Sequence, residues 1–469
     1  MYKIKEIFFT HEVYLYLESD LIMPDVISIT NQTDDSSAPF SSSASSSSSV
    51  DTEMKSPYLA IPLVPVVEGR QGVRFDFNDG ARVMVPEIKP EIGQWHIRLS
   101  DYSTGNILFD ARLKSGMVTS TKKFFIPFTI DVWLEKSDGT REDVLHHELS
   151  LKGAPVLVQL PVGTLGDTIA WLPAVLRLAR ESGANVTCSI ADVILPLVKA
   201  ANPNITLVGH GEAKVDKDFT AGFYASYKIG LFFTDTEFAH QPTDFRHVGL
   251  HRTAAYILGV NPWDEIPPPI TIQNGDIPPI KGPYVVIATQ ASTQCKYWNN
   301  PAGWHQVIAF LKTSGYRVIC IDQKTFNGTG YVYNHIPHGV EDETGNRPLA
   351  ERARWLKHAS FFIGLSSGLA WLAHAAGTPV VMISGFTHPD NEFATPYRII
   401  NWHTCNSCWN DPEYQFEHKD FLWCPRHKGT DRQFECTRLI TGAQVIHTVK
   451  RLIKDKGLPL ESSKKNLPL

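Results

Sequence analysis

Residues 156–173 read VLVQLPVGTLGDTIAWLP, and this stretch predicts a buried strand, a glycine-containing loop and the start of a helix. From Thr168 onward, Ile169 and Leu172 recur at the spacing of an amphipathic helix. Such a junction leaves backbone N–H groups unpaired at the helix N-terminus, where they point toward an anion at the carboxyl end of the strand. Asp167 is the ionisable side chain of this loop. An aspartate in this place serves either as a helix cap or as a catalytic base.

The alternation of strands and helices continues on both sides of a proline-rich connector, IPPPITIQNGDIPPIKGP, at residues 266–283. Strands separated by helices predict parallel sheets with right-handed crossovers. We therefore expect an α/β fold with two Rossmann-like lobes, the first over residues 153–280 and the second over residues 281–400. Ligands of such lobes bind in the cleft that faces the carboxyl ends of the strands.

The segment ahead of the first lobe, residues 57–152, has a different pattern. Short alternating runs are separated by turn dipeptides, Asp79-Gly80 and Asp138-Gly139 among them. This pattern predicts a small antiparallel β-domain, either a barrel or a sandwich. Its composition offers no convergent catalytic groups, so we expect a role in docking, assembly or orientation of an acceptor.

The N-terminal residues 1–56 predict a disordered or linker-like segment, because they combine a serine tract at 41–49 with few large apolar residues. A short β-like run at 12–18 interrupts this composition. No run is long and apolar enough for a signal peptide or a spanning helix, so we expect a cytoplasmic protein without a membrane span. The net charge of −5 over 469 residues argues against nucleic acid as a partner.

Two loops of the second lobe are expected to face the opening loop across the cleft. In ATQASTQCKYWNNPAGW, Lys296 lies between a strand and a helix, where a lysine either offsets the charge of a phosphate or is simply solvated. In FFIGLSSGLAWLAHAAGTPVVMIS, Ser366 and Ser367 begin an apolar helix, either as caps or as donors to an anion. Asp322 and Gln323 end another strand, at the place where this topology reads a ribose or an adenine.

Residues 401–440 contain CNSCWNDPEYQFEHKDFLWCPRHKGTDRQFEC, in which a C-x2-C pair is followed by two more cysteines. This pattern is typical of a structural tetrathiolate metal site, which zinc and iron fit almost equally well. Buried thiols or disulfides are the alternative, and His403, His418 and His427 are substitute ligands. The expected ligands are Cys405, Cys408, Cys424 and Cys436. Residues 441–469 predict a final amphipathic helix and a polar tail.

The three lobe motifs, VGTLGDTIAWLP, ATQASTQCKYWNNPAGW and FFIGLSSGLAWLAHAAGTPVVMISG, together resemble the ADP-heptose-dependent heptosyltransferases, which have two lobes in the GT-B arrangement. The resemblance implies that Asp167 is the general base toward the acceptor hydroxyl and that Lys296 contacts the donor phosphates. It implies that Thr164, Leu165 and Gly166 face the transferred sugar. It places Ser366, Ser367, Gly368 and Leu369 at the turn that holds the diphosphate and the sugar.

The cysteine segment resembles the autotransporter branch of that family, in which it implies a structural iron ion (Fe3+), with zinc as the alternative, an N-terminal β-domain and rings of twelve subunits. The implied activity is transfer of heptose from ADP-heptose to serine hydroxyls of an autotransporter passenger protein. Lipopolysaccharide heptosyltransferases typically have an acid and a histidine where this chain has Ser366 and Trp371. A lipopolysaccharide inner-core heptosyltransferase and a non-catalytic metal-finger scaffold are the alternative functions.

Overall fold

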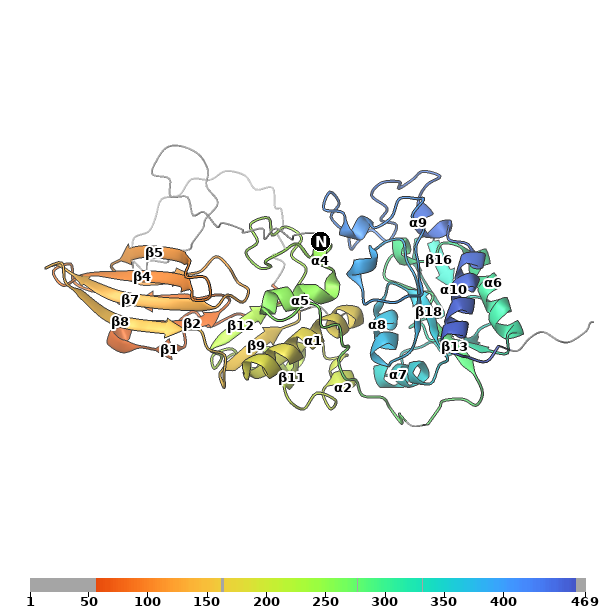
Figure 1. The fold of residues 1–469 in the computed structure, drawn as a ribbon, viewed down its shortest axis with the longest axis horizontal. Coiled ribbons are helices and arrows are strands. Elements are labelled where there is room, and N and C mark those ends of the chain that lie inside the picture. The colour runs from red at the N-terminus through yellow and green to blue at the C-terminus, as the bar shows by residue number, and fades with distance from the viewer. Residues whose placement is uncertain (1–55, 162–163, 276, 331, 461–469) are drawn as a thin grey trace, which may run out of the picture. The chain divides into compact units, whose positions relative to one another are not determined.

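The structure, a computed structural model, describes residues 56–161, 164–275, 277–330 and 332–460. The expected N-terminal linker with its serine tract therefore lies outside the described residues, except for residue 56. Of the expected C-terminal helix and tail, residues 441–460 are described. The described residues form two compact units, one of residues 62–150 and one of residues 56–61 and 151–460 (Figure 1). Each unit is described by itself.

The first unit consists of antiparallel strands, as the alternating pattern predicts. One group contains β1 (Val67–Glu68), β2 (Arg74–Asn78), β3 (Arg82–Val85) and β6 (Gly116–Thr119), with the short helix η1 (Arg70–Gly72) after β1. The other contains β4 (Gly93–Asp101), β5 (Ile107–Leu113), β7 (Phe128–Lys136) and β8 (Arg141–Glu148) in the order β5-β4-β7-β8. The dipeptides Asp79-Gly80 and Asp138-Gly139 form the turns of the hairpins β2–β3 and β7–β8. Both Asp79 and Gly80 have positive φ, as a tight hairpin turn requires.

The second unit begins with a parallel sheet in the order β11-β10-β9-β12. Its strands are β9 (Pro155–Gln159), β10 (Asn185–Ile190), β11 (Thr206–Gly209) and β12 (Ala225–Lys228). Its helices are α1 (Leu165–Ser182), α2 (Leu195–Val198), α3 (His210–Val215), α4 (Phe245–Val248) and α5 (Leu250–Leu258). The centre of β9 is fully buried, as the apolar run predicts. Helix α1 starts at Leu165, three residues before the expected start at Thr168, because Thr164 already caps it.

A second parallel sheet follows in the order β17-β14-β13-β18-β19-β20. Its strands are β13 (Tyr284–Ile287), β14 (Arg317–Cys320), β17 (Glu341–Asp342), β18 (Phe362–Leu365), β19 (Val380–Ile383) and β20 (Arg398–Ile399). The connecting elements are η2 (Gln294–Lys296), α6 (Pro301–Thr313), the hairpin β15 (Phe326–Thr329) and β16 (Val332–His335), α7 (Leu349–Lys357), α8 (Gly368–Ala375) and η3 (Pro389–Asn391). This is the doubly wound order. The chain adds strands on one side of β13 up to β17 and then on the other side, starting with β18. The loops after β13 and β18 therefore border the ligand crevice.

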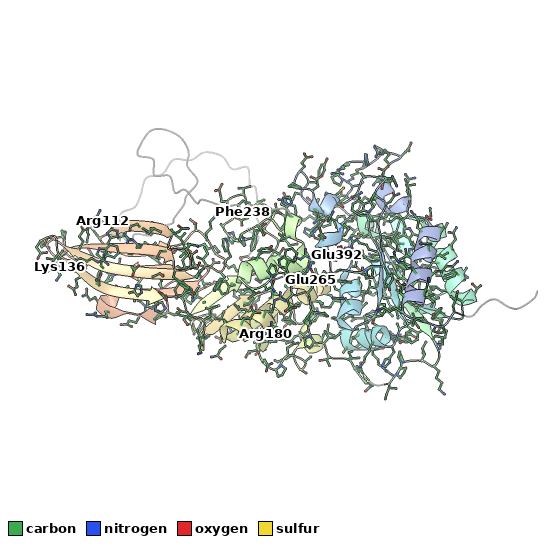
Figure 2. All side chains as sticks on the ribbon, viewed as in Figure 1. Arg112, Lys136, Arg180, Phe238, Glu265 and Glu392 are labelled. Carbon is green, nitrogen blue, oxygen red and sulfur yellow. The ribbon has the colours of Figure 1, made fainter. Side chains whose placement is uncertain are left out.

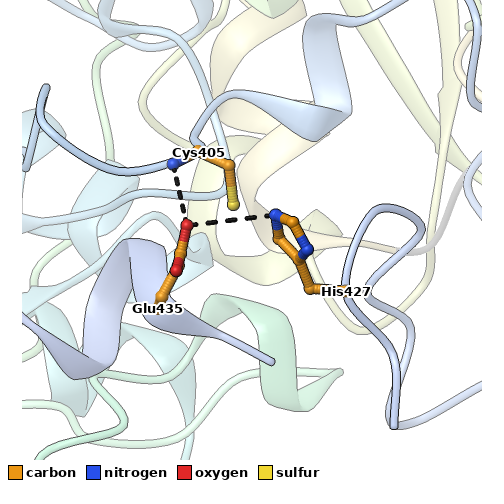
Figure 3. Close-up of side chains that lie close together, drawn as sticks. All are labelled: Cys405, His427 and Glu435. Carbon is orange, nitrogen blue, oxygen red and sulfur yellow. Dashed lines mark hydrogen bonds and ion pairs between the residues drawn. The ribbon is translucent and has the colours of Figure 1, made fainter. Parts of the chain in front are cut away.

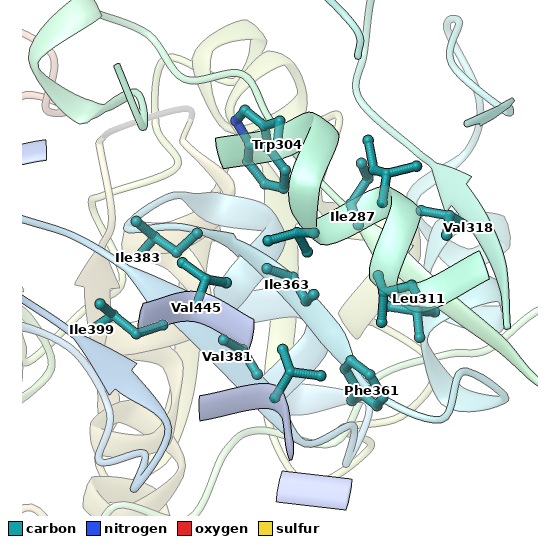
Figure 4. Close-up of a cluster of buried hydrophobic side chains, with 14 of the residues drawn as sticks. Ile287, Trp304, Leu311, Val318, Phe361, Ile363, Val381, Ile383, Ile399 and Val445 are labelled. Atoms are coloured by element: carbon teal, nitrogen blue, oxygen red, sulfur yellow. The ribbon is translucent and has the colours of Figure 1, made fainter. Parts of the chain in front are cut away.

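The core of this second lobe lies between its sheet and the helices α6 and α10 (Gly442–Asp455) (Figure 4). Trp304 and Leu311 of α6 and Val445 of α10 pack on the buried residues of the central strands. The final helix thus forms as its apolar stripe predicts, and Thr441 and Gln444 form a capping box at its start. Residues between β20 and α10 contain the short helices η4 (Cys408–Asn410) and α9 (Glu435–Arg438). Among the described residues no helix is long and apolar enough to cross a bilayer.

Candidate active site

Asp167 lies in the first turn of α1, after the carboxyl end of β9. The N-cap is Thr164, whose hydroxyl oxygen accepts the Asp167 N–H at 3.4 Å. The same hydroxyl donates to the Asp167 carboxylate. Thr164, and not Asp167, is therefore the helix cap. The side chain is half-buried at the lip of the loop.

The N-termini of α1 and α8 meet at two glycines. A Cβ atom added to Gly368 would lie 3.0 Å from Leu165 Cβ and 3.2 Å from the Gly166 nitrogen. A Cβ atom added to Gly166 would lie 3.1 Å from Trp371 Cδ1 and 3.4 Å from Gly368 Cα. The first turns of the two helices are therefore in contact, and helix N-termini are places that favour an anion.

Ser366 and Ser367 differ in their surroundings although they are neighbours. The Ser366 hydroxyl donates to the buried carboxylate of Glu392, which is labelled in Figure 2. Glu392 also pairs with Arg398 at 2.7 Å, so Ser366 is part of a buried polar network. Ser367 is the N-cap residue of α8, and its buried hydroxyl has no hydrogen-bond partner among the described residues. The Ser366 hydroxyl is therefore engaged within the protein, whereas the Ser367 hydroxyl is unpaired among the described residues. Leu369, the other residue expected at this turn, is half-buried in the first turn of α8.

Lys296 ends the short helix η2 in the loop between β13 and α6. Its Nζ lies over the ring of Phe386, with 5.3 Å between Nζ and the ring centroid. The first residues of this loop are fixed by the buried Asp322, which accepts the Thr289 N–H and hydroxyl, each at 2.8 Å. Asp322 was expected to read a ribose or an adenine from its strand end. Its carboxylate instead bonds the loop that leads to Lys296.

Asp167 and Lys296 interact electrostatically, although they come from different lobes. Burial raises the pKa of Asp167 above its ordinary value, while the Thr164 hydroxyl and the charges of Lys296 and His418 lower it. Burial and the charge of Lys296 in turn lower the pKa of His418. His418 therefore shares the site, although the sequence pattern suggests it only as a substitute metal ligand. No sequence motif indicates that His418 lies within electrostatic reach of Asp167.

The expected metal ligands gather in the segment after β20. Burial and the charges of Cys405, Cys408 and Cys424 raise the pKa of Cys436, so the four thiols lie within electrostatic reach of one another. Burial raises the pKa of Cys405 to about 12 and that of Cys408 to about 11. All four cysteines are free thiols in the structure. The alternative that they form disulfides is therefore wrong.

One of these thiols, Cys405, belongs to a group of three close ligand atoms (Figure 3). In the described part of the chain, Cys405, His427 and Glu435 place their ligand atoms within 4.8 Å of one another. Glu435 accepts the Cys405 N–H at 3.2 Å and pairs with Arg432 at 2.6 Å. The hydrogen bond from Arg432 lowers the pKa of Glu435 to about 2. This group offers one soft thiol donor suited to iron or zinc, together with an imidazole and a carboxylate.

Two protein families match separate parts of the chain. Residues 69–136 match the N-terminal domain of the glycosyltransferase TibC. Residues 268–419 match glycosyltransferase family 9, the heptosyltransferases. The first match lies within the antiparallel unit, and the second covers the second lobe with the first part of the cysteine segment.

Individual relatives extend over most of the chain. The autotransporter heptosyltransferase TibC of Escherichia coli O78:H11 (strain H10407) is 48% identical over 405 residues, which are 86% of this chain and 95% of TibC. A protein of Burkholderia thailandensis described as the inactive autotransporter heptosyltransferase BimC is 41% identical over 391 residues, 83% of this chain and 88% of BimC. Sequence similarity alone therefore does not separate active from inactive members.

The structure resembles the crystal structure of TibC from enterotoxigenic E. coli H10407, an iron-containing dodecameric glycosyltransferase. The TM-score is 0.78 at 47% identity, and the match covers 85% of this chain and 100% of TibC. A second TibC structure, in complex with ADP-D-beta-D-heptose, gives a TM-score of 0.77 at 46% identity with the same coverage, 85% of this chain and 100% of TibC.

Proposed function

Because this chain belongs to the autotransporter heptosyltransferases, we propose that it transfers heptose from ADP-heptose to serine hydroxyls of an autotransporter passenger protein, with Asp167 as the general base. The observation that carries the proposal is that the charge of Lys296, from the second lobe, acts on the Asp167 carboxylate of the first lobe, whose helix start contacts that of α8. Transfer from a nucleotide sugar needs a base at the acceptor and positive groups at the leaving diphosphate.

In the proposed reaction, Asp167 takes the proton of the acceptor hydroxyl while the oxygen of that hydroxyl bonds to the anomeric carbon of heptose. The bond between that carbon and the β-phosphate oxygen breaks, and ADP leaves with the electron pair. Lys296, the Ser367 hydroxyl and the N–H groups at the start of α8 would stabilise the charge that develops on the diphosphate. Thr164, Leu165 and Gly166 line the loop that would face the sugar.

The half-buried position of Asp167 suits this role. Burial raises its pKa, so the carboxylate is a stronger base than an exposed aspartate. The hydrogen bond from Thr164 and the charge of Lys296 oppose this effect, which keeps the group ionised at neutral pH in our proposal.

We further propose that Cys405, Cys408, Cys424 and Cys436 hold one structural metal ion, for which iron is favoured by the iron-containing TibC. Four thiolates leave no open coordination position, so the ion would fix the segment rather than take part in transfer. His427 and Glu435 would then lie outside the ligand set and orient Cys405. The dodecameric state of TibC suggests a ring of twelve for this chain, and we place the protein in the cytoplasm.

The test incubates the purified chain with ADP-heptose and either a serine-rich passenger fragment or a truncated lipopolysaccharide core. We expect the passenger fragment to gain the mass of heptose on serine residues, with equimolar release of ADP. Transfer to the lipid core alone would favour an inner-core heptosyltransferase. The absence of both transfer and donor hydrolysis would place the chain with inactive relatives such as BimC.

A further inference from the structure

The ammonium group of Lys296 lies in a cage of three aromatic rings. Its Nζ is 5.3 Å from the ring centroid of Phe386, 5.8 Å from that of Trp409 and 5.7 Å from that of Phe416. The rings also contact one another, with centroids 5.5 Å apart for Phe386 and Trp409, 5.6 Å for Phe386 and Phe416, and 5.2 Å for Trp409 and Phe416. Phe386 and Phe416 are buried, so the cage is a packed part of the molecule.

An aromatic cage holds a lysine differently from a carboxylate. A carboxylate would neutralise the ammonium group and accept its N–H groups, whereas ring faces attract the charge and leave the N–H donors unpaired. In the described part of the chain, Lys296 contacts these rings and forms no salt bridge. A lysine otherwise loses considerable rotamer freedom when it binds a ligand. The cage orders this side chain in advance and preserves its full charge for an anion.

The cage is built largely from the cysteine segment. Trp409 directly follows Cys408, and its N–H donates to the Phe386 carbonyl at 3.1 Å. The Ser407 N–H donates to the Gly385 carbonyl at 2.8 Å, which fixes the C-x2-C turn along the backbone that carries Phe386. Gly385 also lies against Cys436, because a Cβ atom there would approach Cys436 Cβ to 2.7 Å. The rings therefore depend on the fold of the segment that contains the candidate metal ligands.

We infer that the cage of Phe386, Trp409 and Phe416 is a positioning device that orients Lys296 toward the diphosphate of the donor. This inference rests on the proposed function, in which Lys296 contacts that diphosphate. It assigns the cysteine segment a part in donor binding in addition to its structural role. The three aromatic residues act through Lys296 and do not themselves contact the reacting atoms.

The experiment measures the affinity of the full-length, metal-loaded protein for ADP by calorimetry. Trp409→Leu removes the ring, and Trp409→Phe keeps an aromatic face. Both variants lose the hydrogen bond from Trp409 Nε1 to Asn391, so their difference isolates the effect of the ring. We expect Trp409→Leu and Phe416→Leu each to weaken ADP binding about three- to tenfold and Trp409→Phe to restore most of the affinity. The matched control is Tyr414→Leu. Tyr414 belongs to the same aromatic cluster, but its ring contacts Arg426 instead of Lys296.

The substitution Trp409→Leu, made in a Lys296→Ala protein, distinguishes an effect on the orientation of Lys296 from a general loosening of the cysteine segment. In a Lys296→Ala protein, Trp409→Leu should cause no further loss of ADP affinity, because the side chain that the ring orients is gone. An equal loss in both backgrounds would overturn the cage as a positioning device. If Lys296→Ala weakens ADP binding but the cage variants do not, this inference is wrong and the proposed function stands. Unchanged affinity in Lys296→Ala would instead contradict the role of Lys296 in the proposed function. Metal content, measured on every variant, should stay at the wild-type level.

Discussion

Gly166 and Gly368 bring the first turns of α1 and α8 into backbone contact, so that the two lobes present their helix N-termini to a single place. A Cβ atom on Gly368 would lie 3.2 Å from the Gly166 nitrogen, closer than side chains normally approach a neighbouring backbone. The absence of side chains at both positions is therefore what allows the two positive helix ends to converge.

Gly368→Ala should separate the two helix N-termini. The new methyl group must displace Leu165 or the α1 backbone by a few tenths of an ångström, since it would lie 3.0 Å from Leu165 Cβ. Misplacement of this size weakens oriented donors strongly, so we expect kcat/KM for heptose transfer to fall about tenfold or more. Steady-state kinetics checks this. The control is Gly222→Ala, where an added Cβ meets open space. Wild-type kinetics in Gly368→Ala would show that the contact does not matter.

Asp167→Asn should abolish transfer while ADP binding remains. A general base contributes about a hundredfold or more to the rate, and the amide of asparagine does not accept the proton. Transfer rates and ADP titration of the same preparation test both halves. The exposed Asp218→Asn in the same lobe serves as the control. An Asn variant that transfers heptose at the wild-type rate would remove Asp167 from the mechanism.

The raised pKa of Asp167 also predicts two pH dependences. The base acts when ionised, so activity should fall as the pH drops through a pKa above the usual aspartate value of about 3.9. For an acid whose pKa is raised by folding, the stability contribution is present at low pH and is lost as the pH rises through the folded-state pKa. Asp167→Asn should therefore have a higher Tm than the wild type at about pH 8, and the difference should shrink toward about pH 4. A lower Tm of the variant at both pH values would contradict the burial effect.

The two serines of the α8 turn should respond differently to replacement by alanine. Ser367→Ala removes a buried hydroxyl without a protein partner, so we expect weaker ADP-heptose binding with an unchanged Tm. Ser366→Ala removes a hydrogen bond to the buried Glu392 and should lower the free energy of unfolding by about 1–3 kcal/mol. Thermal unfolding and donor titration of both variants give the comparison. Equal effects of the two replacements on stability would argue against this division of roles.

Metal content should distinguish the two ligand sets. If the four thiolates hold the ion, Cys405→Ser and Cys424→Ser should lose it and unfold at lower temperature, because metal binding contributes to folding free energy. His427→Ala would then retain the metal, whereas it should lose it if Cys405, His427 and Glu435 form the site. Emission spectrometry with thermal unfolding measures both. Cys188→Ala, a buried thiol of β10, is the control expected to keep the ion.

The local elements of the α/β unit were predictable because their signals are local. The buried strand before Asp167, the apolar helix after Ser367 and the stripe of the last helix are each encoded by residues within one element. The hairpin turns at Asp79-Gly80 and Asp138-Gly139 are equally local, since they depend on the φ that those residues tolerate.

By itself, the sequence predicted the parallel strands and the loops at their carboxyl ends, and it indicated Asp167, Lys296 and Ser367 as candidates for handling a proton and a diphosphate. Only the tertiary structure decided which of the polar residues form contacts within the protein. It made Thr164 the helix cap, tied Ser366 to Glu392, used Asp322 to hold a loop, and placed rings from residues 386–416 around Lys296. The physical reason is that these outcomes depend on contacts between residues far apart in the chain, which spacing and periodicity do not encode.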